Sequence, residues 1–153
     1  MTWVHNKCYG ARFRILPNSR IQVEGRPYLT AETNPARLQN LKQTWENWKP
    51  IIIKWSKIRT QECIDKKKEN PQAECVPITP AQILAIMTQE TGHLSKNKSV
   101  QANAVSPAGA TGLMQIMPAR VFWKGSEMHK MILTHDRKNP DHSVKLGSWL
   151  LQR

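Results

Sequence analysis

An apolar helix that ends in an acidic residue is the feature that most constrains the fold of this chain. Thr79 suits an N-cap, and Pro80 suits the first helical position, where its missing N–H costs nothing. Ile83, Ile86, Met87 and Glu90 then follow at spacings of three and four, which places them on one face of a helix. Gly92 is a natural stop. The spacing therefore predicts a helix over residues 80–91 with Glu90 on its apolar stripe.

The position of Glu90 has a chemical consequence. A carboxyl group partly desolvated against Ile86 and Met87 should have a raised pKa, which suits a general acid working near neutral pH. The alternative is that Glu90 is simply the last polar residue before a helix cap. Periodicity by itself does not decide between the two.

A loop of small residues follows this helix, over residues 103–112. Gly109 and Gly112 permit backbone conformations closed to other residues, and small neighbours let the chain approach a ligand closely. Most glycine-rich loops are only turns. This loop is a candidate for a site because it follows the acidic helix in the sequence. A second short apolar helix is expected over residues 112–118.

Taken in order, these elements resemble a known signature. Glu90, then Ala-Val-Ser-Pro-Ala-Gly-Ala at 104–110, then Gly-Leu-Met-Gln-Ile-Met-Pro at 112–118 are similar to the soluble lytic transglycosylase family. These goose-lysozyme-like enzymes cut peptidoglycan, and the resemblance covers roughly residues 77–120. It implies a lysozyme-like fold with Glu90 as the sole catalytic acid/base. It also implies that Ser106, Gln115 and Met117 line the saccharide cleft, Met117 through its backbone carbonyl, with no metal or organic cofactor.

Two departures from the family pattern matter. The stretch from Thr91 through Asn103 is longer than the family usually has, which leaves the path beside the acid open. The family also continues with an Ala-Tyr-Asn-Ala-Gly segment whose Tyr reaches into the active site, and no such segment precedes Arg153. Residues 142–151 resemble the helix before that segment. We therefore expect a C-terminally short domain, which other virion or secretion-machine proteins could complete.

The rest of the chain suggests a mainly α (α+β) fold with a small N-terminal extension. Residues 1–30 read as a β-hairpin, because apolar residues alternate on both sides of a polar turn at 17–19. Residues 31–153 form the lysozyme-like domain. Its first helix should begin at Asn34 and Pro35 and reach about Thr60, with a kink or a division into two abutting helices at Pro50. An apolar stripe runs along it, at Leu38, Leu41, Trp45, Trp48, Ile52 and Trp55, which indicates core or a partner surface.

The remaining elements are less well specified. The polar run at residues 65–72 is interpreted as a loop, and Cys63 and Cys75 bracket it. A disulfide between them and a pair of reduced thiols remain equally open. Residues 118–132 read as a helix interrupted near Gly125. No Cys or His spacing is typical of a metal site.

The charge balance favours polyanionic partners. The chain has 23 Lys and Arg against 11 Asp and Glu, a formal charge of +12. Peptidoglycan, anionic lipid surfaces and nucleic acid all qualify, but no nucleic-acid-binding motif supports the last. No apolar run could span a bilayer and no secretory signal is visible. We therefore expect delivery to the host periplasm or cell wall by a phage particle, a lysis pore or a secretion machine.

These observations lead to one expected function and one alternative. The resemblance implies a lytic transglycosylase that cleaves the β-1,4 bond between N-acetylmuramic acid and N-acetylglucosamine with Glu90 alone, during phage infection or lysis. Whether the product is a 1,6-anhydro sugar or a hydrolysed one stays open. The alternative is a catalytically weak virion or wall-binding protein that keeps a lysozyme-like half.

Overall fold

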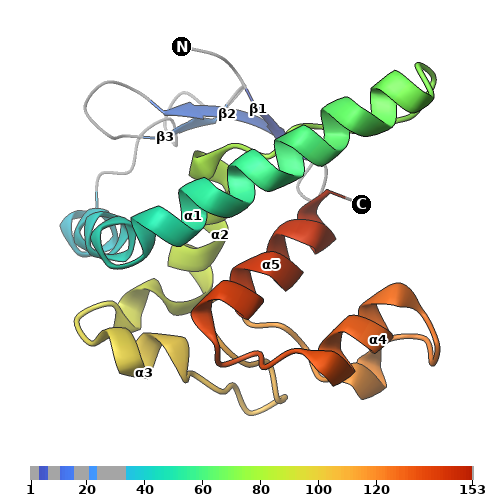
Figure 1. Cartoon of the computed structure of the whole chain (residues 1–153). Coiled ribbons are helices and arrows are strands. Elements are labelled where there is room, and N and C mark those ends of the chain that lie inside the picture. The colour runs from blue at the N-terminus through green and yellow to red at the C-terminus, as the bar shows by residue number, and fades with distance from the viewer. Residues whose placement is uncertain (1–3, 7–10, 16–20, 24–33, 153) are drawn as a thin grey trace.

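The computed structural model describes residues 4–6, 11–15, 21–23 and 34–152, and most of them are helical (Figure 1). Three short strands come first and form an antiparallel sheet in the order β1 (Val4–Asn6), β2 (Ala11–Ile15) and β3 (Ile21–Val23). Phe13 pairs with Val23 and Ile15 with Ile21, as expected for the predicted hairpin. The turn at 17–19 lies outside the described residues. The division into 1–30 and 31–153 stays a prediction.

Helix α1 (Pro35–Glu69) is longer than the sequence indicated. It begins as expected at Asn34, whose Oδ1 accepts a hydrogen bond of 3.0 Å from the N–H of Ala36. The expected end near Thr60 is wrong, because the helix continues to Glu69. Of the loop expected at 65–72, residues 65–69 are helical and only residues 70–72 lie outside the helix. The lysines of its last turn are good helix formers and interact favourably with the C-terminal end of the helix dipole. The helix ends one residue before Asn70-Pro71, since a residue that precedes proline disfavours the helical region.

Pro50 lies inside α1, as the sequence predicts. It cannot donate a hydrogen bond to the carbonyl one turn earlier, and its ring crowds that carbonyl. Figure 1 shows the first turns of α1 nearly end-on and the rest of the helix running across the view, so the axis changes direction. A bend at this position is the expected consequence of an internal proline.

Helix α2 (Pro80–Thr91) has the caps that local chemistry predicts. Thr79 and Gln82 form a capping box, in which the N–H of Gln82 donates to Thr79 Oγ1 and the N–H of Thr79 donates to Gln82 Oε1. Gly92 caps the other end. The stretch after it, whose path the sequence left open, forms the 3-10 turn η2 (Gly92–Leu94) and the short helix α3 (Lys98–Ala102).

The segment at 104–118 differs from the expected short helix. It forms a loop closed by two isolated antiparallel bridges, Val105 with Thr111 and Thr111 with Ile116. Gly112 and Gln115 have φ angles of 84° and 50°, which a right-handed helix does not allow. The expected helix over 112–118 is therefore wrong.

Three more elements complete the described chain: η3 (Ala119–Val121), α4 (Glu127–Thr134) and α5 (Pro140–Leu151). The predicted interruption near Gly125 is confirmed, although only a 3-10 turn precedes it. Helix α5 matches the helix that the resemblance placed at 142–151. No described helix has both the length and the apolar character needed to cross a membrane.

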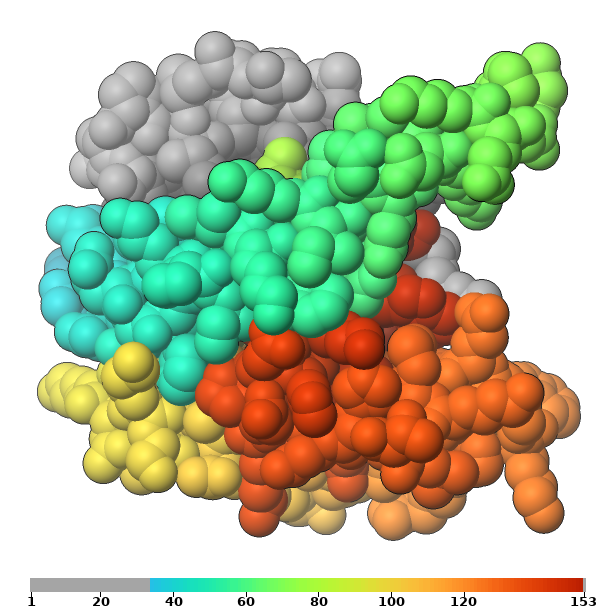
Figure 2. Space-filling view, in the orientation of Figure 1, coloured from blue at the N-terminus to red at the C-terminus, as the bar shows by residue number. Residues whose placement is uncertain are grey.

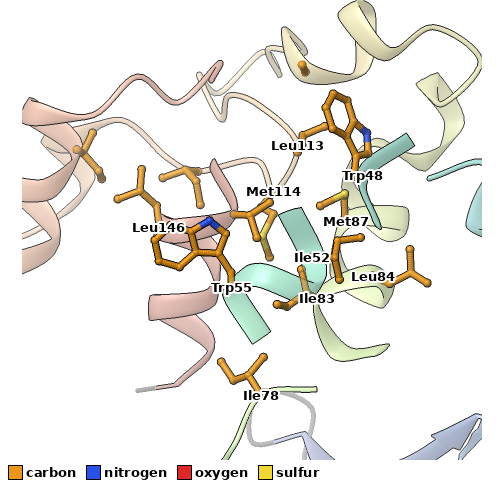
Figure 3. Packing of buried hydrophobic residues seen from close by; sticks show 14 of the residues in the cluster. Trp48, Ile52, Trp55, Ile78, Ile83, Leu84, Met87, Leu113, Met114 and Leu146 are labelled. Atoms are coloured by element: carbon orange, nitrogen blue, oxygen red, sulfur yellow. The ribbon is translucent and has the colours of Figure 1, made fainter. Parts of the chain in front are cut away.

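The core lies where α1, α2, α5 and the loop at 104–118 meet (Figure 3). Trp48 and Trp55 of the α1 stripe are buried, which confirms the core reading of that stripe. Ile52, Ile83, Met87, Leu113, Leu146 and Val144 have no exposed surface. Each such aliphatic side chain stabilises the fold by roughly 1.5–3 kcal/mol.

The C-terminal turns of α1 extend past this core, and in Figure 2 the green end of the helix projects from the molecule. Cys63 and Cys75 form a disulfide there, with 5.5 Å between their Cα atoms. Of the two states that the sequence left open, the structure has the bonded one. The bond holds the segment after α1 against the helix.

Candidate active site

Glu90 lies in the last turn of α2, but not on its buried stripe. The buried row of the helix runs through Ile83, Met87 and Thr91, each spaced by four residues. Glu90 precedes Thr91 and is exposed as a residue. The predicted place of Glu90 on the apolar stripe is therefore wrong, because the residue after it completes the row.

The carboxyl group of Glu90 is nevertheless partly desolvated. Partial burial raises its pKa above the ordinary value of 4.5, because it disfavours the charged form. The direction is the one that the sequence analysis expected. An exposed side chain with a partly buried acid group can reach a substrate and still hold its proton above the usual pH range.

The residue next to Glu90 joins α2 to the loop at 104–118, which we call the signature loop. Thr91 is fully buried, and its hydroxyl lies 2.9 Å from the carbonyl oxygen of Leu113. A second acceptor, the carbonyl oxygen of Met87, lies 3.3 Å away. The hydrogen bond to Leu113 fixes the end of the acid-bearing helix against the signature loop.

A buried amide extends this connection to α1. Gln101 of α3 has no exposed surface, and its Nε2 donates to Thr44 Oγ1 and Thr91 Oγ1 over 3.3 and 3.5 Å. Its Oε1 accepts hydrogen bonds of 2.8 Å from Trp48 Nε1 and 3.2 Å from Asn47 Nδ2. The stretch from Thr91 through Asn103 is thus bonded to α1 and, through Gln101, to the turn that carries Glu90.

Two of the predicted cleft residues hold the signature loop together. Ser106 closes its tip, because Ser106 Oγ accepts a hydrogen bond of 3.0 Å from the N–H of Ala110. Gln115 Nε2 donates to the carbonyl oxygens of Ala104 and Gly112, over 3.2 and 2.9 Å. Both side chains therefore help to fix the shape of the signature loop.

Met117 comes directly after the bridged part of the loop and is half-buried. The structure therefore brings Ser106, Gln115 and Met117 together in one segment, and it joins that segment to α2 through Thr91 and Leu113. Roles for these residues toward a substrate stay predictions.

Arg137 supports the same loop from the segment before α5. Its Nη1 donates to the carbonyl oxygens of Gly109 and Ile116, over 3.0 and 2.8 Å. Gly112 passes close to the backbone of Arg137, where a Cβ atom on Gly112 would lie 2.0 Å from the carbonyl oxygen. Ser143 Oγ of α5 accepts a hydrogen bond of 3.2 Å from the N–H of Met114.

A hollow of about 410 Å³ lies between α1 and α2, beside the residue before the acid. Arg37, Asn40, Thr88, Gln89 and His93 are among its lining residues, and Glu90 is not. Arg37 Nη2 donates to Gln89 Oε1 over 3.4 Å across this hollow. Within the part of the chain that the structure describes, no group of three His, Cys, Asp or Glu residues is arranged to hold a metal ion.

Sequence reasoning missed the residues that support the site. Thr91, Gln101 and Arg137 act through partners that lie 10 to 57 positions away in the chain, so local patterns carry no sign of them. The one available signal was that a polar Thr91 stands where the apolar period of α2 calls for a buried residue.

Comparison with known proteins gives one match. Residues 63–153 match the family model described as the transglycosylase SLT domain. This range contains α2, the signature loop, α4 and α5. No curated protein matches the chain.

Proposed function

The chain belongs to the SLT transglycosylase domain family, and from this premise we propose that it cleaves peptidoglycan with Glu90 as its single acid/base. Family membership indicates lytic transglycosylase activity on peptidoglycan. The proposal adds the identity of the acid and the steps that it performs. The observation that carries it is the position of Glu90, partly desolvated and bonded through Thr91 to the signature loop.

The proposed reaction needs one carboxyl group in two protonation states. Protonated Glu90 donates its proton to the glycosidic oxygen as the bond between that oxygen and C1 of N-acetylmuramic acid breaks. The N-acetyl group of the substrate stabilises the positive charge that develops at C1, in place of a second carboxylate. Glu90, now ionised, takes the proton of the C6 hydroxyl, and O6 bonds to C1 to give the 1,6-anhydro sugar.

A raised pKa of Glu90 supports the first of these steps. A carboxyl group of ordinary pKa would be almost fully ionised at neutral pH, so only a small fraction of the protein could donate a proton. Desolvation keeps a larger fraction of Glu90 protonated. The same group becomes a competent base once its proton has left.

The proposal includes a place of action. The Cys63–Cys75 disulfide is suited to an oxidising compartment such as the periplasm, where peptidoglycan also lies. We place the activity at the host wall during phage infection or lysis, with delivery by a virion, lysis pore or secretion machine. Thiol labelling of the protein recovered from that compartment would test this placement, because a reduced pair there contradicts it.

The decisive experiment is mass spectrometry of the soluble fragments released from purified peptidoglycan. The parent protein should release anhydromuropeptides, and Glu90→Gln should lower the rate by roughly 10²- to 10⁴-fold. Glu46→Gln is a matched control, because it makes the same change at an exposed position of α1 and should release fragments like the parent. Equal release by the parent and Glu90→Gln would overturn the assignment of the acid. Hydrolysed rather than anhydro ends would overturn the proposed second step.

A further inference from the structure

Trp123 is exposed to solvent, unlike the tryptophans of the core. Trp48 and Trp55 are 6% and 8% exposed, whereas Trp123 is 89% exposed. A large apolar ring in water has no stabilising role in the fold, and an exposed aromatic residue is a common sign of a binding surface.

The backbone that carries Trp123 is well fixed. The carbonyl oxygen of Trp123 accepts a hydrogen bond of 3.0 Å from the N–H of Ser126, and the N–H of Phe122 donates to Ala119 over 3.0 Å. The Phe122 side chain packs against the core. Trp123 is therefore held outside the body of the protein by a neighbour that is anchored within it.

The segment of Trp123 lies against the signature loop. A Cβ atom on Gly109 would lie 3.7 Å from Arg120 Nη2. Arg120 thus covers the loop at the residue whose carbonyl oxygen Arg137 also binds. Trp123 follows Arg120 by three positions in the chain.

The charges around Trp123 fit an anionic polymer. Residues 118–127 include two exposed cations, Arg120 and Lys124, and one exposed acid, Glu127, so cationic side chains are in excess. The peptide stems of peptidoglycan carry carboxylates, and the C–H groups on one face of a pyranose ring pack well on an indole ring. Insertion into lipid calls for a broad apolar face, and here the exposed apolar neighbour of Trp123 in this segment is Val121.

We propose that Trp123 is a stacking platform for a sugar ring of the peptidoglycan strand, and that Arg120 and Lys124 pair with carboxylates of the peptide stems. The platform rests on the proposed function, because it extends the substrate contact of the same domain. It adds a saccharide site outside the signature loop and gives it a chemical basis, an aromatic face flanked by cations.

The test measures binding without cleavage. Sedimentation with purified peptidoglycan is compared for Glu90→Gln and for the same variant with Trp123→Ala, Trp123→Leu or Trp123→Tyr. Ala and Leu should weaken binding by roughly three- to tenfold, and Tyr should keep it, because stacking needs a flat ring. Leu133→Ala, at another exposed apolar residue on α4, is the control and should bind like Glu90→Gln. Unchanged binding with Trp123→Ala, or full binding with Trp123→Leu, overturns the proposal.

Two further binding experiments distinguish the peptide stems, the sugar strand and a lipid surface as ligands. Arg120→Gln and Lys124→Gln should weaken binding to intact peptidoglycan but not to strands whose peptides an amidase has removed, whereas Trp123→Ala should weaken both. Equal loss of the cationic variants on both substrates overturns their assigned role. Vesicles of equal parts phosphatidylcholine and phosphatidylglycerol form the last arm. Binding to these vesicles that depends on Trp123, without such binding to peptidoglycan, overturns the proposal in favour of a lipid surface.

The outcome is independent of catalysis. Trp123-dependent binding by a chain that releases no fragments would support the platform and count against the proposed cleavage. Fragment release with Trp123-independent binding would do the reverse. Because Trp123 is exposed, its variants should keep the melting temperature of the parent, which thermal unfolding checks.

Discussion

Thr91 donates its hydroxyl hydrogen to the carbonyl oxygen of Leu113 over 2.9 Å, and both residues are fully buried. The two lie 22 positions apart in the chain. This hydrogen bond places the residue after Glu90 against the signature loop, so the geometry of the proposed acid depends on a contact that the acid does not make.

The first prediction concerns this hydrogen bond. Thr91→Val keeps the shape of the side chain but leaves the Leu113 carbonyl without its donor, so the free energy of unfolding should fall by about 1–3 kcal/mol. Fragment release should also slow at a temperature where the variant is fully folded, because the end of α2 is no longer held on the loop. Urea unfolding and the peptidoglycan assay measure the two effects.

Thr134→Val is the control for this change. Thr134 also donates its hydroxyl hydrogen to carbonyl oxygens of its own helix, but it is exposed on α4. The control should change the free energy of unfolding by no more than about 0.5 kcal/mol. Equal changes in the free energy of unfolding for the two substitutions would show that the buried Thr91 hydrogen bond stabilises the fold no more than an exposed one.

The second prediction concerns the coupling of Gln101 to Thr91. Gln101→Leu leaves the indole N–H of Trp48 without its acceptor in a buried site, which should cost about 1–3 kcal/mol of stability. Because Gln101 and Thr91 share a hydrogen bond, the double variant with Thr91→Val should lose less than the sum of the two single losses, by roughly 0.5–3 kcal/mol. Unfolding of all four proteins gives this coupling, and strict additivity would contradict a shared network.

The parts of the fold that the sequence predicted are those set by neighbouring residues. The ends of α2 follow from Thr79, Pro80 and Gly92, and the start of α1 follows from Asn34. The apolar period of α1 correctly placed its tryptophans in the core. Each of these features depends on side chains within one or two turns of each other, so pattern reasoning can find them.

The errors occurred where distant contacts or backbone angles decide. Residues 112–118 are apolar enough for a helix, yet Gly112 and Gln115 adopt positive φ angles because the chain there bonds to α5 and to Arg137. Glu90 lies beside the buried row of α2, and Thr91 rather than Glu90 completes that row and bonds to Leu113. The family resemblance supplied the site, whereas its supports became visible only in three dimensions.

The third prediction follows from the raised pKa of Glu90. If protonated Glu90 starts the reaction, kcat/KM should fall as the pH rises through that pKa, which lies above the ordinary value of 4.5.

The same pKa affects stability. The fold favours the protonated form of Glu90, so its contribution to stability is fully present below its unfolded pKa and is lost as the pH rises through the folded pKa. Glu90→Gln should therefore raise the melting temperature at neutral pH and not below pH 4.5. A lower melting temperature of the variant at neutral pH would reverse the inferred direction.

The fourth prediction concerns the Cys63–Cys75 disulfide, which joins two residues 12 positions apart in the chain. By the loop-entropy estimate, its removal should lower the free energy of unfolding by roughly 3 kcal/mol. A Cys75→Ser variant should show this loss under oxidising conditions, and the parent should show it when a thiol reductant is added. The reductant should have no further effect on the variant. Identical unfolding of the parent with and without reductant would mean that the bond does not form in solution.

The fifth prediction compares two glycines with almost the same backbone conformation. Gly112 and Gly125 have φ angles of 84° and 82°, so Ala at either position incurs the roughly 1–2 kcal/mol cost of a left-handed residue. At Gly125 a Cβ atom would meet nothing within 4 Å, whereas at Gly112 it would lie 2.0 Å from the carbonyl oxygen of Arg137. Backbone would have to move there, so Gly112→Ala should cost at least about 2 kcal/mol more than Gly125→Ala and should also reduce fragment release. Chemical unfolding of the two variants separates the effect of the contact with Arg137 from the effect of the φ angle, because only Gly112→Ala has both. Equal losses in the free energy of unfolding would show that the signature loop can shift away from Arg137 at little cost.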